Sequence, residues 1–435
     1  MREERLIRAV GVRGLTAGIV NYTVGAGIFV LPALVAAKVG AAAPIVYVIC
    51  AVAMGLIVLC FADAGSRVSL SGGTFAYAEV AFGPYLGFMV AIGLWISMIL
   101  ASASVVNVFV GSLARLSPAT SGPFARSSII LLVYAALTLV NVRGVKLGSG
   151  VVQTVTVAKL APVLILIAFG LFAVHGANLS WPGMPTASDT ARTAVILIFA
   201  FMGVESALTP SGELRDPART VPRAILIALG FVAILYIALQ VVTQGILGAE
   251  LATNTQAPLA AAARRVLGRG GELLVLIGAA VSTLGYIAGD MLAAPRMPYA
   301  LAQNSLLPRV LGAVHDRYRT PHVAIILHAA LCAVLAITGS FASLAVLVVL
   351  LTLFVYLVCC LATIQLQRRD VRVDGSVPFR LPGGPVVPIL ASAIIVWLMS
   401  SSTLREFMLL AALGVVATVM YFIMRGQRGG VVAPT

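Results

Sequence analysis

The sequence predicts an all-α polytopic membrane protein with twelve transmembrane helices, and three observations lead to this prediction. The chain of 435 residues is 60% hydrophobic and only 10% charged, with a mean hydropathy of +1.06, which is far outside the range of soluble domains. Many apolar runs are long enough to cross a bilayer as a helix, which takes about 20 residues. The basic residues gather in alternate loops, as expected for a protein that crosses a membrane repeatedly.

Twelve apolar segments define the expected spans, and none of the polar stretches between them is long enough to form a soluble domain. The spans cover residues 12–37, 44–66, 84–114, 127–141, 150–174, 192–212, 222–247, 273–301, 321–339, 343–366, 385–402 and 404–424. The most polar internal loop covers residues 367–384 and separates ten spans from the last two.

The distribution of Lys and Arg predicts the topology. With both termini on the cytoplasmic side, twenty of these residues fall on or near that side and eight on or near the other, and Lys159 is the one left over. This excess indicates an even number of spans in a multi-pass protein of the cell membrane. The net charge of +14 is dispersed over many loops without interleaved aromatic residues, so we expect no nucleic-acid partner.

Cysteine and histidine patterns give no indication of a metal or another cofactor. All five cysteines lie inside apolar segments, where we expect them to be core residues without metal-binding spacing to histidine. His328 is the one histidine within a span, and we expect it to pack rather than to bind a ligand. The sequence contains no Gly-Lys-Ser/Thr nucleotide loop and no cluster of His, Cys or acids at one membrane face. We therefore predict that the protein is not an enzyme and is not driven directly by ATP.

The first span contains two glycines near its middle, in the segment Thr23–Phe29. Glycine is a poor helix former and leaves the backbone accessible to another group. If the helix unwinds here, the amides of Ala26, Gly27 and Ile28 open a new half-helix whose positive end binds carboxylates. The alternative is an unbroken helix that packs through its small residues.

The sixth span has a similar interruption, since Gly203 is followed two residues later by Glu205. A pair of interrupted apolar segments at corresponding places in two halves of a chain is typical of transporters built from inverted repeats. A carboxylate at membrane depth needs a partner or a proton. Glu205 either organises the broken helix or couples transport to protons; alternatively it is a neutral acid hydrogen-bonded to nearby backbone.

Two further ionisable residues lie in apolar segments. Lys159 follows Gly150 by nine residues, about 13 Å along a helix, where a lysine costs roughly 2.5–3.5 kcal/mol and must face a cavity or a partner. We interpret it as a structural or proton-coupling ammonium, the alternative being a side chain that reaches back to the membrane surface. Asp63 lies near the cytoplasmic end of its span, and we expect its carboxylate to reach the interface.

Taken in order and with their spacing, six groups of residues resemble the amino acid–polyamine–organocation superfamily, specifically its bacterial amino acid permeases of the inner membrane. These groups are Gly25-Ala26-Gly27-Ile28-Phe29 with Pro32; Ser71-Gly72-Gly73 with Tyr77; Phe82-Gly83-Pro84; Phe201-Met202-Gly203-Val204-Glu205-Ser206-Ala207; Arg215-Asp216-Pro217 with Pro222; and Ala300-Leu301-Ala302 before Leu307-Pro308. The resemblance covers nearly the whole chain.

The resemblance implies a 5+5 inverted-repeat core with broken helices 1 and 6, plus two extra helices. The core would cover residues 1–366, with repeats at about 12–174 and 192–366. A cytoplasmic linker, 367–384, would connect it to helices 11 and 12 and the C-terminal tail, 385–435. Alternating access would take place around a site at the two broken helices.

The resemblance also implies roles for individual residues. It places the substrate carboxylate on the amides around Gly25, Ala26, Gly27 and Ile28. It places the amino group on carbonyls near Thr23 and at Phe199 and Met202, beside Gly203. Phe199 matches an aromatic gate, Ser102 a polar pocket position, and Lys159 a position that a sodium ion takes in related transporters.

Asp290 is the remaining candidate. The resemblance places it near the substrate side chain, where it would select a cationic or polar group. Alternatively, it pairs with Arg296, six residues later, or caps a kink. The implied function is secondary active transport of amino acids, by proton symport or by exchange. The alternatives are an exporter, a carrier of polyamines or other amines, and a substrate sensor on the same fold that does not transport.

Overall fold

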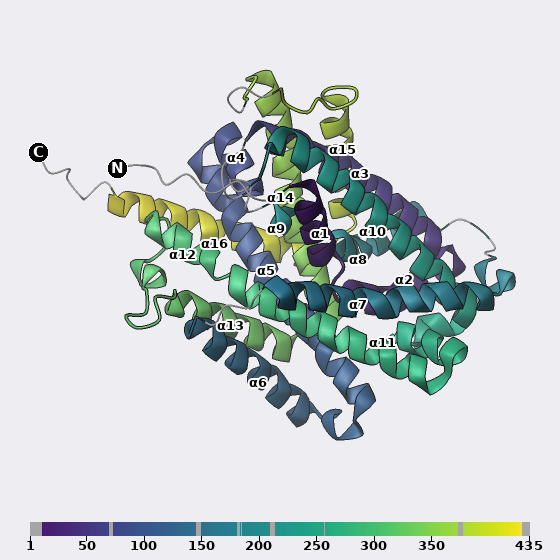
Figure 1. Ribbon diagram of the computed structural model, residues 1–435. Coiled ribbons are helices and arrows are strands. Elements are labelled where there is room, and N and C mark those ends of the chain that lie inside the picture. Colours follow the sequence, from purple (N-terminus) through teal and green to yellow (C-terminus); the bar gives the residue numbers. More distant parts are fainter. Residues whose placement is uncertain are drawn as a thin grey trace, which may run out of the picture.

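The computed structural model describes residues 11–68, 73–144, 149–180, 183, 185–208, 214–255, 257–372 and 377–428. Within these ranges the regular structure is helical (Figure 1). Ser71 and Gly72 of the resemblance motifs lie outside the described residues, as do the first ten residues with their three arginines.

Each expected span coincides with one helix or with two consecutive helices. These are α1 (Val12–Thr23) with α2 (Gly27–Val39), α3 (Ala43–Arg67), α5 (Pro84–Leu116), α6 (Pro123–Val142), α7 (Ser149–Gly170), α8 (Ala187–Phe201) with α9 (Val204–Ala207), α10 (Pro217–Leu247), α11 (Pro258–Ala293), α13 (His322–Thr338), α14 (Phe341–Arg368), α15 (Val386–Ser400) and α16 (Leu404–Arg428). Two shorter helices, α4 (Thr74–Phe82) and α12 (Arg296–Gln303), lie in the connections.

The helices agree with a polytopic membrane protein. In the described parts of the chain, eight helical segments are long and apolar enough to cross a membrane, and three shorter apolar helices accompany them. The number of twelve spans stays a prediction, as does the division into repeats. α11 begins fifteen residues before the expected span and changes direction at Gly268, whose φ of 65° is outside the helical range.

The chain leaves helical geometry at both glycine motifs. Between α1 and α2, Val24 has a ψ of 81° and the Gly25 amide donates to the Thr23 carbonyl at 2.8 Å. Between α8 and α9, Met202 is extended and Gly203 has a φ of 124°. The positive φ requires glycine, because other residues lose energy there. Each interruption lies where the sequence places its glycine.

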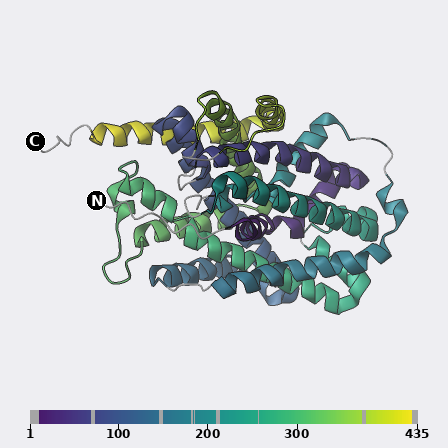
Figure 2. The same ribbon diagram turned by 45° about the horizontal axis from the view of Figure 1, so that its top comes forward.

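The first broken helix lies at the centre of the bundle. α1 packs against α10, while α10 also packs along α3, and α11 packs along α7. Figure 2 shows α1, in dark purple, nearly end-on between the pair α3 and α10 and the pair α7 and α11. α5 and α14 pack against each other beside it. The interruption in α1 and α2 is therefore surrounded by protein, where an irregular backbone is tolerated at membrane depth.

Peripheral helices expose apolar side chains. On α6, Leu131 and Leu132 are 53% and 69% exposed, and on α16 the side chains of Val415, Val416 and Phe422 are also exposed. An exposed apolar face of this kind suits contact with lipid chains.

The prediction that Asp63 reaches the membrane interface is wrong. Its carboxylate is fully buried inside the protein. Arg67, one turn later on α3, donates to it and so compensates its charge. Gln367 of α14 donates to the other carboxylate oxygen at 2.5 Å. These contacts connect α3 to the end of α14.

Candidate functional site

A cavity of about 1940 Å³ lies between the two broken helices and continues toward α12 and the C-terminal end of α16. Nine of the twelve predicted site residues line it. They are Gly25, Ala26, Gly27, Lys159, Phe199, Met202, Gly203, Glu205 and Asp290. The structure thus brings residues from four separate segments of the chain to one concave site, which is the usual form of a small-molecule site.

The other three predicted residues do not line this cavity. Thr23 is 5% exposed, and its carbonyl oxygen lies 2.9 Å from the hydroxyl of Tyr236, which donates to it. Ile28 is buried in the core. Ser102 is fully buried behind the wall and accepts a hydrogen bond of 3.1 Å from the hydroxyl of Tyr134.

The N-terminal end of α2 faces the cavity. Ala26 and Gly27 line the cavity, and no side chain of the described residues caps the helix at Ala26. The first amides of a helix have no acceptor within it, so they carry a partial positive charge. This end of α2 is suited to bind an anionic group.

The two interruptions touch each other through their backbones. A Cβ atom added to Gly203 would lie 2.8 Å from the carbonyl carbon of Tyr22 and 2.9 Å from the amide nitrogen of Thr23. The hydroxyl of Tyr236 lies 2.9 Å from the carbonyl oxygens of both Thr23 and Ala200, so it joins α1 to α8. The sequence patterns did not indicate the role of Tyr236.

Glu205 holds the second interruption in place. Both carboxylate oxygens lie 3.1 Å from the amide nitrogen of Gly203, which donates to them. The hydroxyl of Tyr356 on α14 donates to Oε2 at 2.6 Å. The expected contact of Glu205 with nearby backbone is therefore present, together with a hydrogen bond from Tyr356 that no local sequence pattern indicates.

Lys159 reaches the first broken helix. Its ammonium group donates a hydrogen bond to the carbonyl oxygen of Asn21 in α1, and its side chain is 4% exposed. Lys159 and Asn21 both line the cavity. The side chain is thus directed into the protein and not toward a membrane surface.

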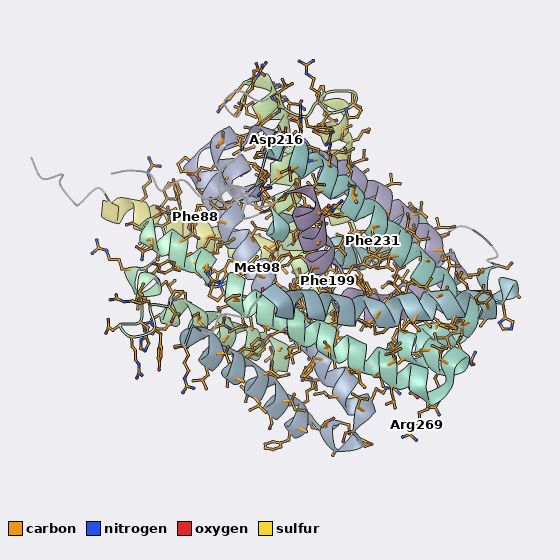
Figure 3. The ribbon with its side chains drawn as sticks, in the orientation of Figure 1. Phe88, Met98, Phe199, Asp216, Phe231 and Arg269 are labelled. Carbon is orange, nitrogen blue, oxygen red and sulfur yellow. The ribbon has the colours of Figure 1, made fainter. Side chains whose placement is uncertain are left out.

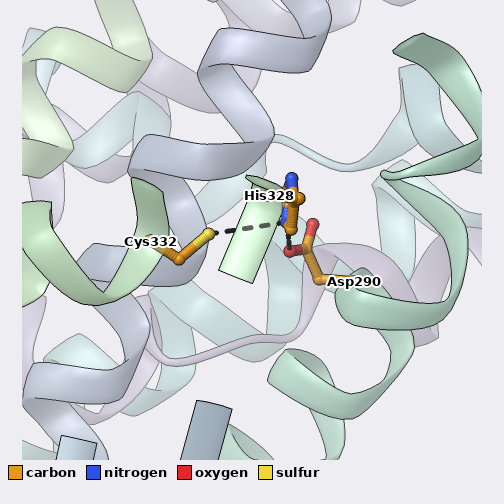
Figure 4. Close-up of side chains that lie close together, drawn as sticks. All are labelled: Asp290, His328 and Cys332. Atoms are coloured by element: carbon orange, nitrogen blue, oxygen red, sulfur yellow. Dashed lines mark hydrogen bonds and ion pairs between the residues drawn. The ribbon is translucent and has the colours of Figure 1, made fainter. Parts of the chain in front are cut away.

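Asp290 belongs to a cluster of three buried side chains (Figure 4). Its Oδ2 lies 2.9 Å from Nε2 of His328, and Sγ of Cys332 lies 3.5 Å from the same nitrogen. The alternative pairing with Arg296 is not present, because Arg296 donates to the carbonyl of Leu292. The sequence did contain a signal for this cluster, since His328 and Cys332 are four residues apart and share one face of α13.

Aromatic and thioether side chains complete the wall. Phe199 of α8 and Met98 of α5 both line the cavity and lie near the centre of the bundle (Figure 3). The ring of Phe199 meets that of Phe341 edge-on, with centroids 5.5 Å apart. Phe199 is therefore placed where an aromatic gate is expected, and its gating role stays a prediction.

Comparisons with known proteins agree with this architecture. The chain matches the amino acid permease family over residues 10–424. It is 28% identical to the methylthioribose transporter of Bacillus subtilis (97% of this chain and 94% of that protein are covered). It is 27% identical to the serine/threonine exchanger SteT of the same organism, with 93% of each chain covered. An uncharacterized transporter of Mycobacterium tuberculosis is 29% identical over 77% of this chain and 75% of its own. The chain therefore belongs to the amino acid permease family, within the amino acid–polyamine–organocation superfamily.

Proposed function

We propose that this protein is a secondary active transporter that moves amino acids across the cell membrane by alternating access. The observation that carries the proposal is the meeting of two interrupted helices at one cavity. The amide end of α2 and the carbonyl end of α8 both border it, at Ala26 and Gly27 and at Phe199 and Met202. An α-amino acid carries one anionic and one cationic group on adjacent atoms, and the two helix ends offer the matching opposite partial charges.

In this proposal the substrate carboxylate binds the amides of Ala26 and Gly27. The ammonium group binds carbonyls at the end of α8, at Phe199 and Met202. The Thr23 carbonyl is a weaker candidate than the sequence suggests, because Tyr236 already donates to it. The ammonium is therefore assigned to α8 alone.

Asp290 is the group we assign to the substrate side chain. Its carboxylate lines the cavity beyond the broken helices and accepts from a hydroxyl or an amine. Serine and threonine, named for one relative, and methylthioribose, named for another, all bear hydroxyl groups. We therefore place hydroxyl-bearing substrates first in the test, followed by basic amino acids and polyamines.

Coupling is assigned to Lys159 and Glu205, which both line the cavity and contact the two broken helices. A proton lost from Lys159 would weaken its hydrogen bond to the Asn21 carbonyl and so act on α1.

We also propose that the protein has twelve transmembrane helices, of which ten form two repeats of five, and that both termini are cytoplasmic. With that topology the cavity, which also borders Arg296 and Asn304, opens to the cytoplasm.

The test is uptake of labelled substrates into liposomes that contain the purified protein. Each substrate is measured with an inward proton gradient, without a gradient, and with unlabelled substrate inside. Accumulation that needs the gradient and is lost in Lys159→Ala, but not in the matched control Lys38→Ala, supports proton symport. Lys38 is exposed at the end of α2.

Other outcomes separate the alternatives. Flux only into preloaded vesicles identifies an exchanger and removes the proton from the mechanism. Flux of amines but of no amino acid contradicts the proposed substrate class. Substrate binding without flux under all three conditions identifies a sensor and contradicts the proposed transport.

A further inference from the structure

The cluster of Asp290, His328 and Cys332 has the composition and the geometry of a metal site. The carboxylate oxygen, the imidazole nitrogen and the thiol sulfur all lie within 4.8 Å of one another. The oxygen and the sulfur are 2.9 and 3.5 Å from the nitrogen (Figure 4). Ligands of a tetrahedral zinc ion lie roughly 3.3–3.6 Å apart, given bonds of about 2.0–2.3 Å. Small side-chain rotations would therefore convert the cluster into three ligands around one ion.

The helices hold these ligands in a suitable arrangement. His328 and Cys332 are one turn apart on α13, and Asp290 faces them from α11. All three side chains are buried, with exposed fractions of 0% for His328 and Cys332 and 7% for Asp290. A thiolate and a carboxylate together neutralise a divalent ion, which favours binding where water is excluded.

An ion can reach the cluster from the cavity. Asp290 lines the cavity of about 1940 Å³, so an ion that enters there meets the carboxylate first. Three protein ligands leave the fourth position of a tetrahedral ion for water or another small ligand from the cavity. The mixed nitrogen, oxygen and sulfur set suits zinc better than magnesium or calcium, which prefer oxygen ligands alone.

We propose that Asp290, His328 and Cys332 bind a zinc ion. The ion connects α11 to α13 and is coordinated by the Asp290 carboxylate, which faces the cavity. Such an ion resists relative movement of the two helices and removes Asp290 as a contact for substrate. Zinc therefore inhibits flux through the protein. The binding claim is independent of transport, whereas the inhibition claim rests on the proposed function.

Cobalt(II) is the probe for binding, because a cobalt–thiolate bond gives a near-ultraviolet charge-transfer band. We expect this band to saturate at one equivalent of cobalt per chain and to disappear when zinc is added. Cys332→Ala should abolish it and His328→Ala should weaken cobalt affinity at least tenfold, because loss even of an outer-shell partner of a metal ligand typically costs about 10–100-fold. Absence of the band in the wild-type protein overturns the proposal.

A matched control is available in Cys50→Ala. Cys50 is also a buried cysteine on a long apolar helix, and its thiol points to a backbone carbonyl of a neighbouring helix, as that of Cys332 does. The band should persist in Cys50→Ala. A band that survives in Cys332→Ala, or that is lost equally in both variants, shows that the site is elsewhere and overturns the assignment.

Flux separates the two claims. We expect zinc to inhibit flux in wild type and in Cys50→Ala, and to leave flux in Cys332→Ala unchanged. Zinc-insensitive flux in a wild-type protein that shows the cobalt band contradicts the inhibition claim while the site stands. Absence of flux with every substrate contradicts the proposed function, and the cobalt titration still decides whether the site exists.

Discussion

The hydroxyl of Tyr356 donates a 2.6 Å hydrogen bond to the carboxylate of Glu205, and through it α14 supports the second interrupted helix. The same carboxylate accepts from the amide of Gly203, so one acidic side chain joins the irregular backbone to a helix that is continuous across the bundle. A buried carboxylate is stable only when its oxygens are satisfied. Tyr356 is therefore part of the support of the site although it does not line the cavity.

Tyr356→Phe should destabilise the protein. The substitution preserves the ring and removes the donor, so the buried carboxylate loses a hydrogen bond of a kind worth about 1.5–3 kcal/mol. We expect a lower free energy of unfolding, measured by denaturant titration in mild detergent. Tyr299→Phe, at a partly exposed tyrosine on α12, is the control and should leave stability unchanged. Equal stability of Tyr356→Phe and wild type would contradict the supporting role.

Glu205→Gln tests whether the same acid carries a proton during transport. Glutamine has nearly the same shape but neither gains nor loses a proton in the working range. We expect uptake driven by a proton gradient to fall to the level seen without a gradient, while exchange into preloaded vesicles persists. Glu79, an exposed acid that also lines the cavity, gives the control Glu79→Gln. Gradient-driven uptake that survives in Glu205→Gln would restrict this acid to a structural role.

Gly203→Ala should be among the most damaging single substitutions at the site. The new Cβ would lie 2.8–3.0 Å from backbone atoms of Tyr22 and Thr23, which cannot move aside as a side chain can. The positive φ adds strain, and overpacking of this kind costs roughly 1–3 kcal/mol before that strain is counted. We expect a lower unfolding temperature and a smaller yield of monodisperse protein.

Gly25→Ala gives the contrast for this prediction. The nearest atoms to its added Cβ are 4.0 Å away, which is ordinary van der Waals contact. We expect Gly25→Ala to unfold near the wild-type temperature. If the two variants unfold at the same temperature, the close approach of the two interruptions is not what limits substitution at Gly203.

The sequence predicted the interruptions because their cause is local. Glycine at positions 25, 27 and 203 weakens the helix at those positions, whatever the rest of the chain does. The position of Lys159 is likewise readable, since a charge in an apolar run must find a cavity. The membrane class followed from signals of this kind, whereas Phe199, Met202 and Asp290 were candidates through the resemblance to the permease superfamily, and the substrate-binding roles stay predictions.

The support of the site could not be read in the same way, because it depends on contacts between distant segments. Tyr236 joins Thr23 across 213 positions, and Tyr356 joins Glu205 across 151. A tyrosine in an apolar run has no local feature that identifies its partner. His328 and Asp290 form a pair of the same kind, because they lie on different helices, 38 positions apart. The packing of the helices alone determines these pairs.

Arg67→Ala should destabilise the contact between α3 and α14. Arg67 is 7% exposed and pairs with the fully buried Asp63. Removal of one partner of a buried ion pair typically lowers the free energy of unfolding by about 3–5 kcal/mol, because an uncompensated charge stays behind. The measurement is again the free energy of unfolding in detergent. Arg372→Ala removes half of the Asp370–Arg372 pair, whose side chains are 62% and 52% exposed, and should have no measurable effect because solvent screens that pair.

A double variant identifies the cause of the loss in Arg67→Ala. Asp63→Asn combined with Arg67→Ala leaves no buried charge, and Gln367 can still donate to the asparagine oxygen. We expect the double variant to be more stable than Arg67→Ala alone. If it is less stable, the loss comes from missing packing and from the second contact of Arg67, to the carbonyl of Val371 at 3.3 Å, and not from the unpaired carboxylate. The sign of that difference decides between charge and packing as the link between α3 and α14.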